Sequence, residues 1–154
     1  MRKVWNFDAT VGKDMLWGDW RNSLGLDDDG RVMLGRCVEK LRDSLEAYGR
    51  GEDQFGLIHA DLRLANLLIE GDRITAIDFD DCGFGWFMYD FAAAISFIET
   101  SPQIPALQKA WLAGYRKIGV LSDADVRILP TMIMLRRILL TAWVASHSRQ
   151  NQWQ

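Results

Sequence analysis

His59-Ala60-Asp61-Leu62-Arg63-Leu64-Ala65-Asn66, followed later by Ile77-Asp78-Phe79-Asp80, is the stretch that decides the fold. It supplies a carboxylate at Asp61, an amide at Asn66 and a second carboxylate at Asp78. Mg²⁺ prefers hard oxygen ligands of this kind, and a metal neutralises charge when a phosphoryl group leaves a nucleotide triphosphate. The spacing is typical of phosphoryl-transfer sites, where the first Asp contacts the acceptor hydroxyl and the Asn and second Asp bind the metal.

The sequence around this motif predicts a β-hairpin that brings its two halves together. Gly71-Asp72 is a two-residue hairpin signal, and apolar runs predict three short strands, at residues 55–58, 67–70 and 73–77. The register of such a loop puts Asn66 opposite Ile77 and next to Asp78. We therefore expect Asn66 and Asp78 to meet at one end of the hairpin, with Asp61 in the loop that leads into its first strand.

Each of these residues also has a plainer interpretation. Asp and Asn are common in turns because their side chains bond to nearby backbone groups. His59 could be a buried, hydrogen-bonded histidine. The coincidence of Asp61, Asn66 and Asp78 at this spacing favours chemistry over simple turn formation.

Three segments together resemble the aminoglycoside phosphotransferase family: residues 59–66, 76–81 and Tyr89-Asp90-Phe91-Ala92. That family includes choline kinases and type II homoserine kinases, and it has a protein-kinase-like fold. The resemblance extends over roughly residues 15–145 and is sharp at 57–92. It implies an enzyme that uses ATP and Mg²⁺ to transfer a γ-phosphoryl group to the hydroxyl of a small-molecule acceptor.

The resemblance also implies roles for the residues of the motif. Asp61 would be the catalytic base or would orient the acceptor, and His59 would be a structural member of the catalytic loop. Asn66 and Asp78 would bind Mg²⁺ and, through it, the nucleotide.

For three further residues the sequence leaves two readings open. Asp80 assists with the metal or lies in a solvated turn beside Asp78. Arg63 contacts phosphate or points to solvent. Asp90, at the start of a helix, braces the catalytic loop or is a plain N-cap.

The expected fold class is α+β and mainly α, a kinase-like large (C-terminal) lobe in which a small β-hairpin carries the catalytic loop. We expect residues 1–154 to form a single domain, with an irregular lead-in at 1–29, a helical lobe at 30–148 and a catalytic segment at 55–92. Residues 83–87 read as a glycine-aromatic loop. Helices are predicted at about 31–48, 90–99, 106–117 and 122–147, with Ser122 as a helix start.

A kinase of this fold also needs a smaller lobe with a glycine-rich strand pair and a strand lysine. No Gly-x-Gly-x-x-Gly precedes His59. Lys3 and Lys13 lack an apolar strand context, and Lys40 falls in a helical pattern. The chain therefore reads as a catalytic lobe whose N-terminal lobe has been truncated or comes from elsewhere.

Composition excludes several classes of function. The net charge of −3 and the absence of a basic cluster argue against nucleic-acid binding. Cys37 and Cys82 make no disulfide framework and fit a reducing compartment. The most apolar run, residues 130–145, is interrupted by Arg136 and Arg137 and reads as too short to span a bilayer. We expect a cytoplasmic protein with no membrane partner.

Two other functions remain open at this stage. The chain could be an inactive lobe that folds and forms a homodimer through the face its partner lobe would cover. A metal-dependent phosphohydrolase is less well supported, because such sites recruit histidines and only His59 and His147 occur. Trp17 and Trp20 form either an aromatic wall of an acceptor pocket or core packing. The sequence does not name the acceptor.

Overall fold

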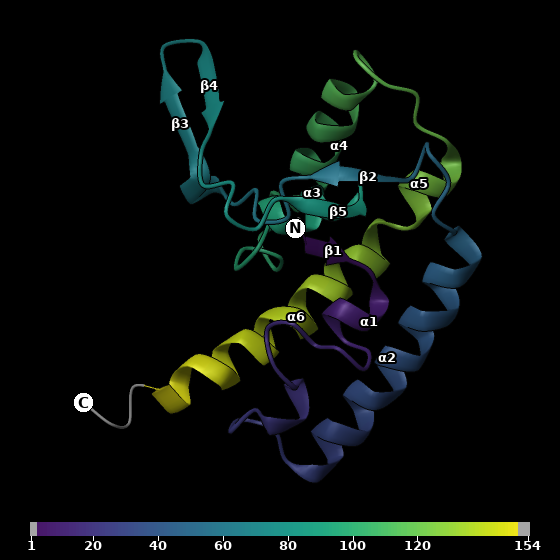
Figure 1. The fold of residues 1–154 in the computed structure, drawn as a ribbon. Coiled ribbons are helices and arrows are strands. Elements are labelled where there is room, and N and C mark those ends of the chain that lie inside the picture. The colour runs from purple at the N-terminus through teal and green to yellow at the C-terminus, as the bar shows by residue number, and fades with distance from the viewer. Residues whose placement is uncertain (1–2, 151–154) are drawn as a thin grey trace.

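The computed structural model describes residues 3–150, with side chains described as far as residue 147. A three-stranded sheet lies between long helices on one side and shorter helices on the other, and a two-stranded hairpin projects from this body (Figure 1). The elements in chain order are β1 (Lys3–Trp5), α1 (Phe7–Thr10), η1 (Trp20–Asn22), α2 (Asp28–Tyr48), β2 (Phe55–Ile58), η2 (Leu64–Asn66), β3 (Leu67–Glu70), β4 (Arg73–Ala76), β5 (Gly83–Trp86), α3 (Tyr89–Ala94), α4 (Ile104–Tyr115), α5 (Asp123–Arg127) and α6 (Leu129–Gln150). The expected mainly helical α+β class is confirmed.

Helix α2 begins and ends as its sequence indicates. The Asp27 carboxylate accepts a hydrogen bond from the Gly30 backbone N–H at 2.7 Å, so Asp27 is the N-cap. Gly49 ends the helix with a φ of 83°, a conformation that favours glycine. The buried face of α2 packs against α6 through Val38, Leu41 and Leu45.

The three-stranded sheet overturns two expectations. Residues 1–29 are not irregular throughout, because β1, α1 and η1 form there. Residues 83–87 are not a loop, because β5 is the central strand in the order β1-β5-β2. The glycines that suggested a loop allow close strand packing: a Cβ atom at Gly83 would lie 2.4 Å from the Lys3 carbonyl oxygen, and one at Gly85 would lie 2.5 Å from Ile58 Cδ1.

The predicted hairpin forms with the predicted register. In β3 and β4, Leu67 pairs with Ala76 and Glu70 pairs with Arg73. The Ile77 N–H donates to the Asn66 carbonyl oxygen at 2.9 Å, which extends the pairing one step toward the motif. The hairpin thus returns the chain from Asn66 to the neighbour of Asp78, as expected.

The helices after the motif match the prediction in part. Helix α3 is shorter than the expected 90–99 segment, and Phe97 beyond it has a φ of 73° that is incompatible with continued helix. Ser122 starts α5 with a capping box, since its side chain bonds to the Asp125 N–H while the Asp125 carboxylate accepts from the Ser122 N–H.

Helix α6 is the main core helix of the molecule. Residues 129–147 are long and apolar enough to cross a membrane by length and composition, so the expectation that this segment is too short was wrong. The apolarity has an explanation in packing, because one face of α6 is buried in the core through Leu129, Met132, Leu135, Ile138, Leu139 and Ala142.

Candidate active site

The loop that carries the motif is held by Asp90 at the start of α3. One Asp90 oxygen accepts from the His59 N–H at 2.9 Å, and the other accepts from the Ala60 N–H at 2.8 Å. Met88 occupies the N-cap position of α3, so the plain N-cap reading of Asp90 was wrong. Burial raises the pKa of the Asp90 carboxyl, although the two backbone hydrogen bonds oppose this rise. Asp90 is a brace for the loop.

His59 joins the loop to the end of the hairpin. Its Nδ1 accepts from the Asp61 N–H at 3.3 Å, which leaves the proton on Nε2 to donate to the Ile77 carbonyl oxygen at 3.0 Å. Its ring also packs against Phe79, with ring centroids 4.6 Å apart. Both nitrogens of His59 are therefore occupied by backbone, which suits a structural member of the loop.

Asp61 is buried and its carboxylate is surrounded by nitrogen donors. Oδ1 accepts from Arg136 Nη2, and Oδ2 accepts from Arg63 Nε at 3.0 Å and from Asn66 Nδ2 at 3.1 Å. Asn66 also donates to the Asp61 carbonyl oxygen at 2.8 Å. Since these contacts fix the carboxylate, Asp61 presents an oriented anionic oxygen.

Asp61 opens into a pocket of about 300 Å³ that four carboxylates line. We call this the acidic pocket, and its lining residues are Trp17, Asp61, Arg63, Asp78, Asp80, Asp81, Phe97, Arg136, Leu140 and Trp143. Lys3 pairs with Asp81, whereas the carboxylates of Asp78 and Asp80 have no hydrogen bond or ion pair with residues 3–147, whose side chains are described. Four of the predicted site residues, Asp61, Arg63, Asp78 and Asp80, thus line one pocket, whereas His59 and Asn66 do not line it.

The donor set suits a divalent cation that arrives with phosphate. Asp78 and Asp80 offer unpaired carboxylates, and the Asn66 amide uses its nitrogen on Asp61, which leaves the oxygen as a possible ligand. No group of three acidic, His or Cys side chains forms a ready metal site within the described residues. Mg²⁺ commonly takes only one or two protein carboxylates and completes its shell with phosphate and water. These residues therefore fit a nucleotide-bound Mg²⁺.

The two early tryptophans have separate roles. Trp17 lines the acidic pocket, as the acceptor-wall reading requires, and its ring lies 5.3 Å from the Arg136 guanidinium. Trp20 is 2% exposed and belongs to the core. Phe97 and Trp143 complete the aromatic wall of the pocket, and the sequence analysis did not single them out because both lie far along the chain from the motif.

Arg136 is the site residue that the sequence pattern least predicts. In the sequence it interrupts an apolar run, yet in the fold it lies in the core and pairs with Asp61. Burial alone lowers the pKa of Arg136, but Tyr89 and Asp61 outweigh that effect, and the pKa lies above its ordinary value. A signal was present, because a charged residue inside an apolar helix needs a buried partner.

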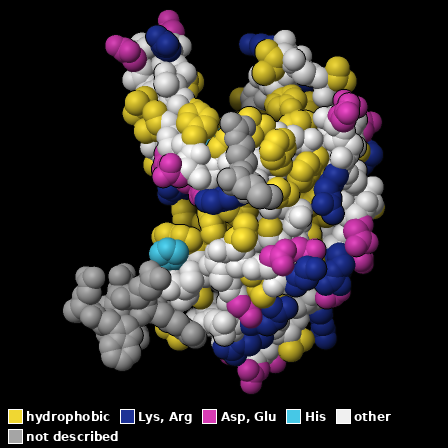
Figure 2. Space-filling view, in the orientation of Figure 1, with side chains coloured by type: hydrophobic (Ala, Val, Ile, Leu, Met, Phe, Trp, Pro, Cys, Tyr) yellow, Lys and Arg dark blue, Asp and Glu magenta, His cyan; other side chains and the backbone are white. Residues whose placement is uncertain are grey.

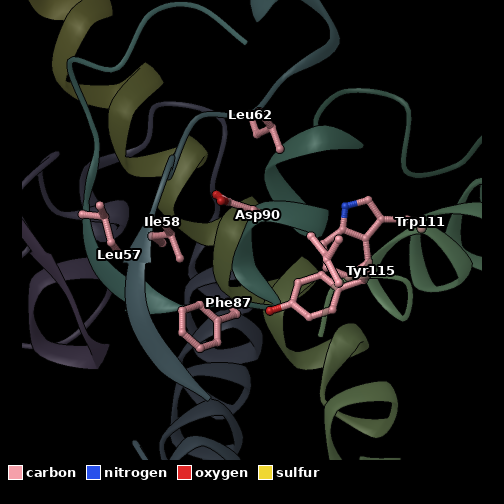
Figure 3. A pocket seen from close by; sticks show the side chains of 9 residues that line it. Leu57, Ile58, Leu62, Phe87, Asp90, Trp111 and Tyr115 are labelled. Carbon is pink, nitrogen blue, oxygen red and sulfur yellow. The ribbon is translucent and has the colours of Figure 1, made fainter. Parts of the chain in front are cut away.

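A larger pocket lies beside the same loop and shares no lining residue with the acidic pocket. It has a volume of about 560 Å³ and is lined mainly by apolar side chains of β2, α4 and the loop, which we call the apolar pocket: Leu57, Ile58, Leu62, Phe87, Asp90, Trp111, Gly114, Tyr115 and Ile118 (Figure 3). The carboxylate in it belongs to Asp90, and both of its oxygens already accept backbone hydrogen bonds. Volume therefore favours this pocket, but chemistry favours the acidic pocket.

Known proteins of one family resemble this chain in sequence. The model of the phosphotransferase enzyme family matches residues 16–121. Amicoumacin kinase of Bacillus subtilis (strain 168) is 31% identical over 73% of this chain and 36% of its own length. Homoserine kinase of Neisseria meningitidis serogroup B is 33% identical over 69% of this chain and 35% of its own length.

Solved structures extend the likeness to the fold. A microcompartment-associated aminopropanol kinase has a TM-score of 0.90 and 46% identity over 96% of this chain and 46% of that chain. An amicoumacin kinase in complex with AMP-PNP, Ca²⁺ and Ami has a TM-score of 0.71 at 24% identity, which is a likeness of fold. The chain spans only about a third of the curated relatives and less than half of these structures. With the family model matching well over half of its residues, the chain belongs to the phosphotransferase enzyme family.

Proposed function

We propose that this chain is the catalytic, C-terminal-type lobe of an ATP- and Mg²⁺-dependent phosphotransferase that acts on a small-molecule hydroxyl. The observation that carries the proposal is the meeting of Asp61, Asp78 and Asp80 in one pocket, with Asn66 bonded to Asp61. Membership of a phosphotransferase family supports the reaction class.

Asp61 is the group that receives or orients the acceptor hydroxyl. Its Oδ1 accepts from Arg136 Nη2, while Oδ2 accepts from Asn66 Nδ2 and Arg63 Nε. The Arg63 side chain is 37% exposed and can turn toward a phosphate oxygen, which would leave one lone pair of Oδ2 for the acceptor hydroxyl. A carboxylate at this position takes the hydroxyl proton as the phosphoryl group is transferred.

Asp78, Asp80 and the Asn66 amide oxygen hold the cation. Mg²⁺ supplies charge neutralisation on the transferred phosphoryl group. The Asp78 backbone has a φ of 64°, which is uncommon for a residue other than glycine, and strain of this kind is often found at functional positions. Asp78 follows the hairpin directly, so the strands fix its place relative to Asn66.

The acceptor class that best suits the acidic pocket is a small amino alcohol. Trp17, Phe97 and Trp143 provide aromatic faces in the wall of the pocket. Aromatic faces attract ammonium groups, so these side chains would hold the amine while Asp61 contacts the hydroxyl. The 46% identity to an aminopropanol kinase supports this class.

A transfer assay tests the proposal. Purified protein is incubated with Mg·ATP and a panel of small amino alcohols and matched neutral diols, and phosphorylated product is measured. We expect transfer to amino alcohols, with Asp61→Asn slower by about 10²–10⁴-fold because the proton acceptor is lost. Asp72→Asn, at the exposed tip of the hairpin, is the matched control and should behave as the original protein. Equal transfer by Asp61→Asn would contradict the assignment.

A second candidate is a lobe that self-associates without turnover. Apolar side chains gather on the face between the hairpin and the helical body (Figure 2). Exposed apolar side chains of the strands include Leu57, Leu68, Ile69, Ile74 and Phe84. Apolar surface that is exposed to water favours association. Sedimentation would show a dimer that Ile69→Lys combined with Ile74→Lys dissociates, and a monomer at all concentrations would exclude it.

A further inference from the structure

Arg136 is the least exposed charged residue in the described part of the chain, at 1%. From the middle of α6 its guanidinium reaches four groups. Nε donates to Ser96 Oγ at 3.1 Å, and Nη1 donates to the Ala60 carbonyl oxygen at 3.2 Å and to the Tyr89 hydroxyl at 3.4 Å. Nη2 donates to Asp61 Oδ1. One side chain therefore ties α6 to the loop and to both ends of the α3 region.

The Ala60 contact is the informative one. Ala60 has a φ of 66°, in the left-handed region that alanine rarely adopts. Its N–H donates to Asp90 at 2.8 Å and its carbonyl oxygen accepts from Arg136 at 3.2 Å. A strained residue persists where its surroundings hold it on several sides. Asp90 and Arg136 thus hold Ala60, the residue that immediately precedes Asp61, by its N–H and by its carbonyl oxygen.

Stability alone does not account for an arginine at this position. A buried ion pair contributes little or nothing to stability compared with well-packed apolar side chains of similar volume. Geometry does account for it, because a planar guanidinium can serve a carbonyl and a carboxylate at once, which a lysine ammonium cannot do in the same way. An arginine at position 136 therefore indicates a role in orienting the Asp61 carboxylate.

We propose that Arg136 is a positioning residue for phosphoryl transfer. It sets the Ala60 peptide and anchors Asp61 Oδ1, so that Asp61 Oδ2 faces the acceptor in the acidic pocket. This inference rests on the proposed function of Asp61. Arg136 does not need to contact the acceptor or the nucleotide to act in this way.

The test is Arg136→Lys, which keeps the positive charge but loses the planar guanidinium and its several N–H donors. Arg137→Lys is the matched control, since Arg137 is the exposed neighbour on the same helix. Folded sites are counted by calorimetric binding of Mg·AMP-PNP, and kcat is expressed per binding site. We expect kcat of Arg136→Lys to fall about 10–100-fold, the scale of a small misplacement of a catalytic group. The KM for Mg·ATP should stay within about twofold, and Arg137→Lys should be unchanged.

A purely structural role gives a different result. It would lower the melting temperature and the number of binding sites, but kcat per site would equal that of the original protein, and this outcome overturns the proposal. If Arg136→Lys does not fold, Ser96→Ala removes the Nε acceptor together with a 3.4 Å hydrogen bond to the Ala92 carbonyl oxygen, and the same criterion applies with a smaller expected fall in kcat. No transfer by the unmutated protein would overturn the proposed function itself, whereas normal transfer per site by Arg136→Lys overturns this inference alone.

Discussion

The loop at residues 59–66 separates two pockets of opposite character. The apolar pocket is the larger, at about 560 Å³ against about 300 Å³ for the acidic pocket. Its one carboxylate, Asp90, has both oxygens occupied by the backbone of the loop. The acidic pocket holds two carboxylates, Asp78 and Asp80, that have no hydrogen-bond or ion-pair partner among residues 3–147.

The difference shows how one loop uses two carboxylates for two purposes. Both carboxylate oxygens of Asp90 accept hydrogen bonds from the loop backbone, and these bonds fix the positions of His59 and Ala60. Asp61 lines the acidic pocket, where Oδ1 accepts from the buried Arg136 and Oδ2 accepts from Asn66 and from the partly exposed Arg63. A site for chemistry needs polar groups that remain available to a ligand, so the unpaired groups are a better guide than the volume of the cavity.

The largest effect should follow from Asp78→Ala, in the acidic pocket. Removal of this carboxylate takes away one of the few protein ligands that Mg²⁺ would have. We expect calorimetry to show no measurable binding of Mg·AMP-PNP, and transfer to be lost with it. Asp72→Ala, which removes a carboxylate from the exposed hairpin tip, is the control for general charge loss. Undiminished nucleotide binding in Asp78→Ala would defeat the metal assignment.

The next effect should follow from Asp90→Ala, on the apolar side. Two backbone N–H groups, of His59 and Ala60, would lose their acceptor in a part-buried position. We expect the free energy of unfolding to fall by about 2–4 kcal/mol, because unsatisfied buried donors are costly. Urea denaturation measures the change, and transfer should weaken as the loop relaxes.

The Asp90 result distinguishes bracing from ligand binding. Bracing predicts that stability falls even when no nucleotide or acceptor is added. A variant with full stability but impaired transfer would instead make Asp90 part of the working site, and the contrast between the two pockets would then fail.

A smaller effect is expected from Trp143→Ala, in the wall of the acidic pocket. Trp143 is 40% exposed and lines the pocket with Trp17 and Phe97, so its removal should cost little stability. We expect the KM for an amino alcohol acceptor to rise several-fold, consistent with about 0.5–1 kcal/mol for a cation over an exposed aromatic face. Steady-state kinetics at saturating Mg·ATP measure this, and a rise in the KM for ATP alone would contradict the placement of the acceptor.

Much of the acidic pocket could be predicted from local sequence. The hairpin register follows from Gly71-Asp72, so the proximity of Asn66 to Asp78 needed no knowledge of the rest of the chain. The N-cap at Asp27 and the stop at Gly49 are equally local. These features depend on residues a few positions apart, where turn and capping rules apply.

The other half of the site depends on contacts between distant segments. Arg136 meets Asp61 across 75 positions, and no periodicity in α6 reveals which arginine faces inward. Strand β5 was missed because its glycines resemble a loop until β1 and β2 lie against it. The resemblance supplied roles for residues, but it carried no information about Arg136 or Trp143.

The smallest effect should follow from Gly114→Leu, which fills the apolar pocket. A Cβ atom at Gly114 would meet nothing within 4 Å, so the new side chain can extend into the pocket without strain. Replacing a helical glycine should raise the free energy of unfolding by about 0.5–1 kcal/mol, and transfer should stay within about twofold because the acidic pocket is untouched. Thermal unfolding and the transfer assay test both halves of this expectation. If Gly114→Leu folds well but no longer transfers a phosphoryl group, the apolar pocket receives a reactant. The assignment of the chemistry to the acidic pocket alone is then wrong.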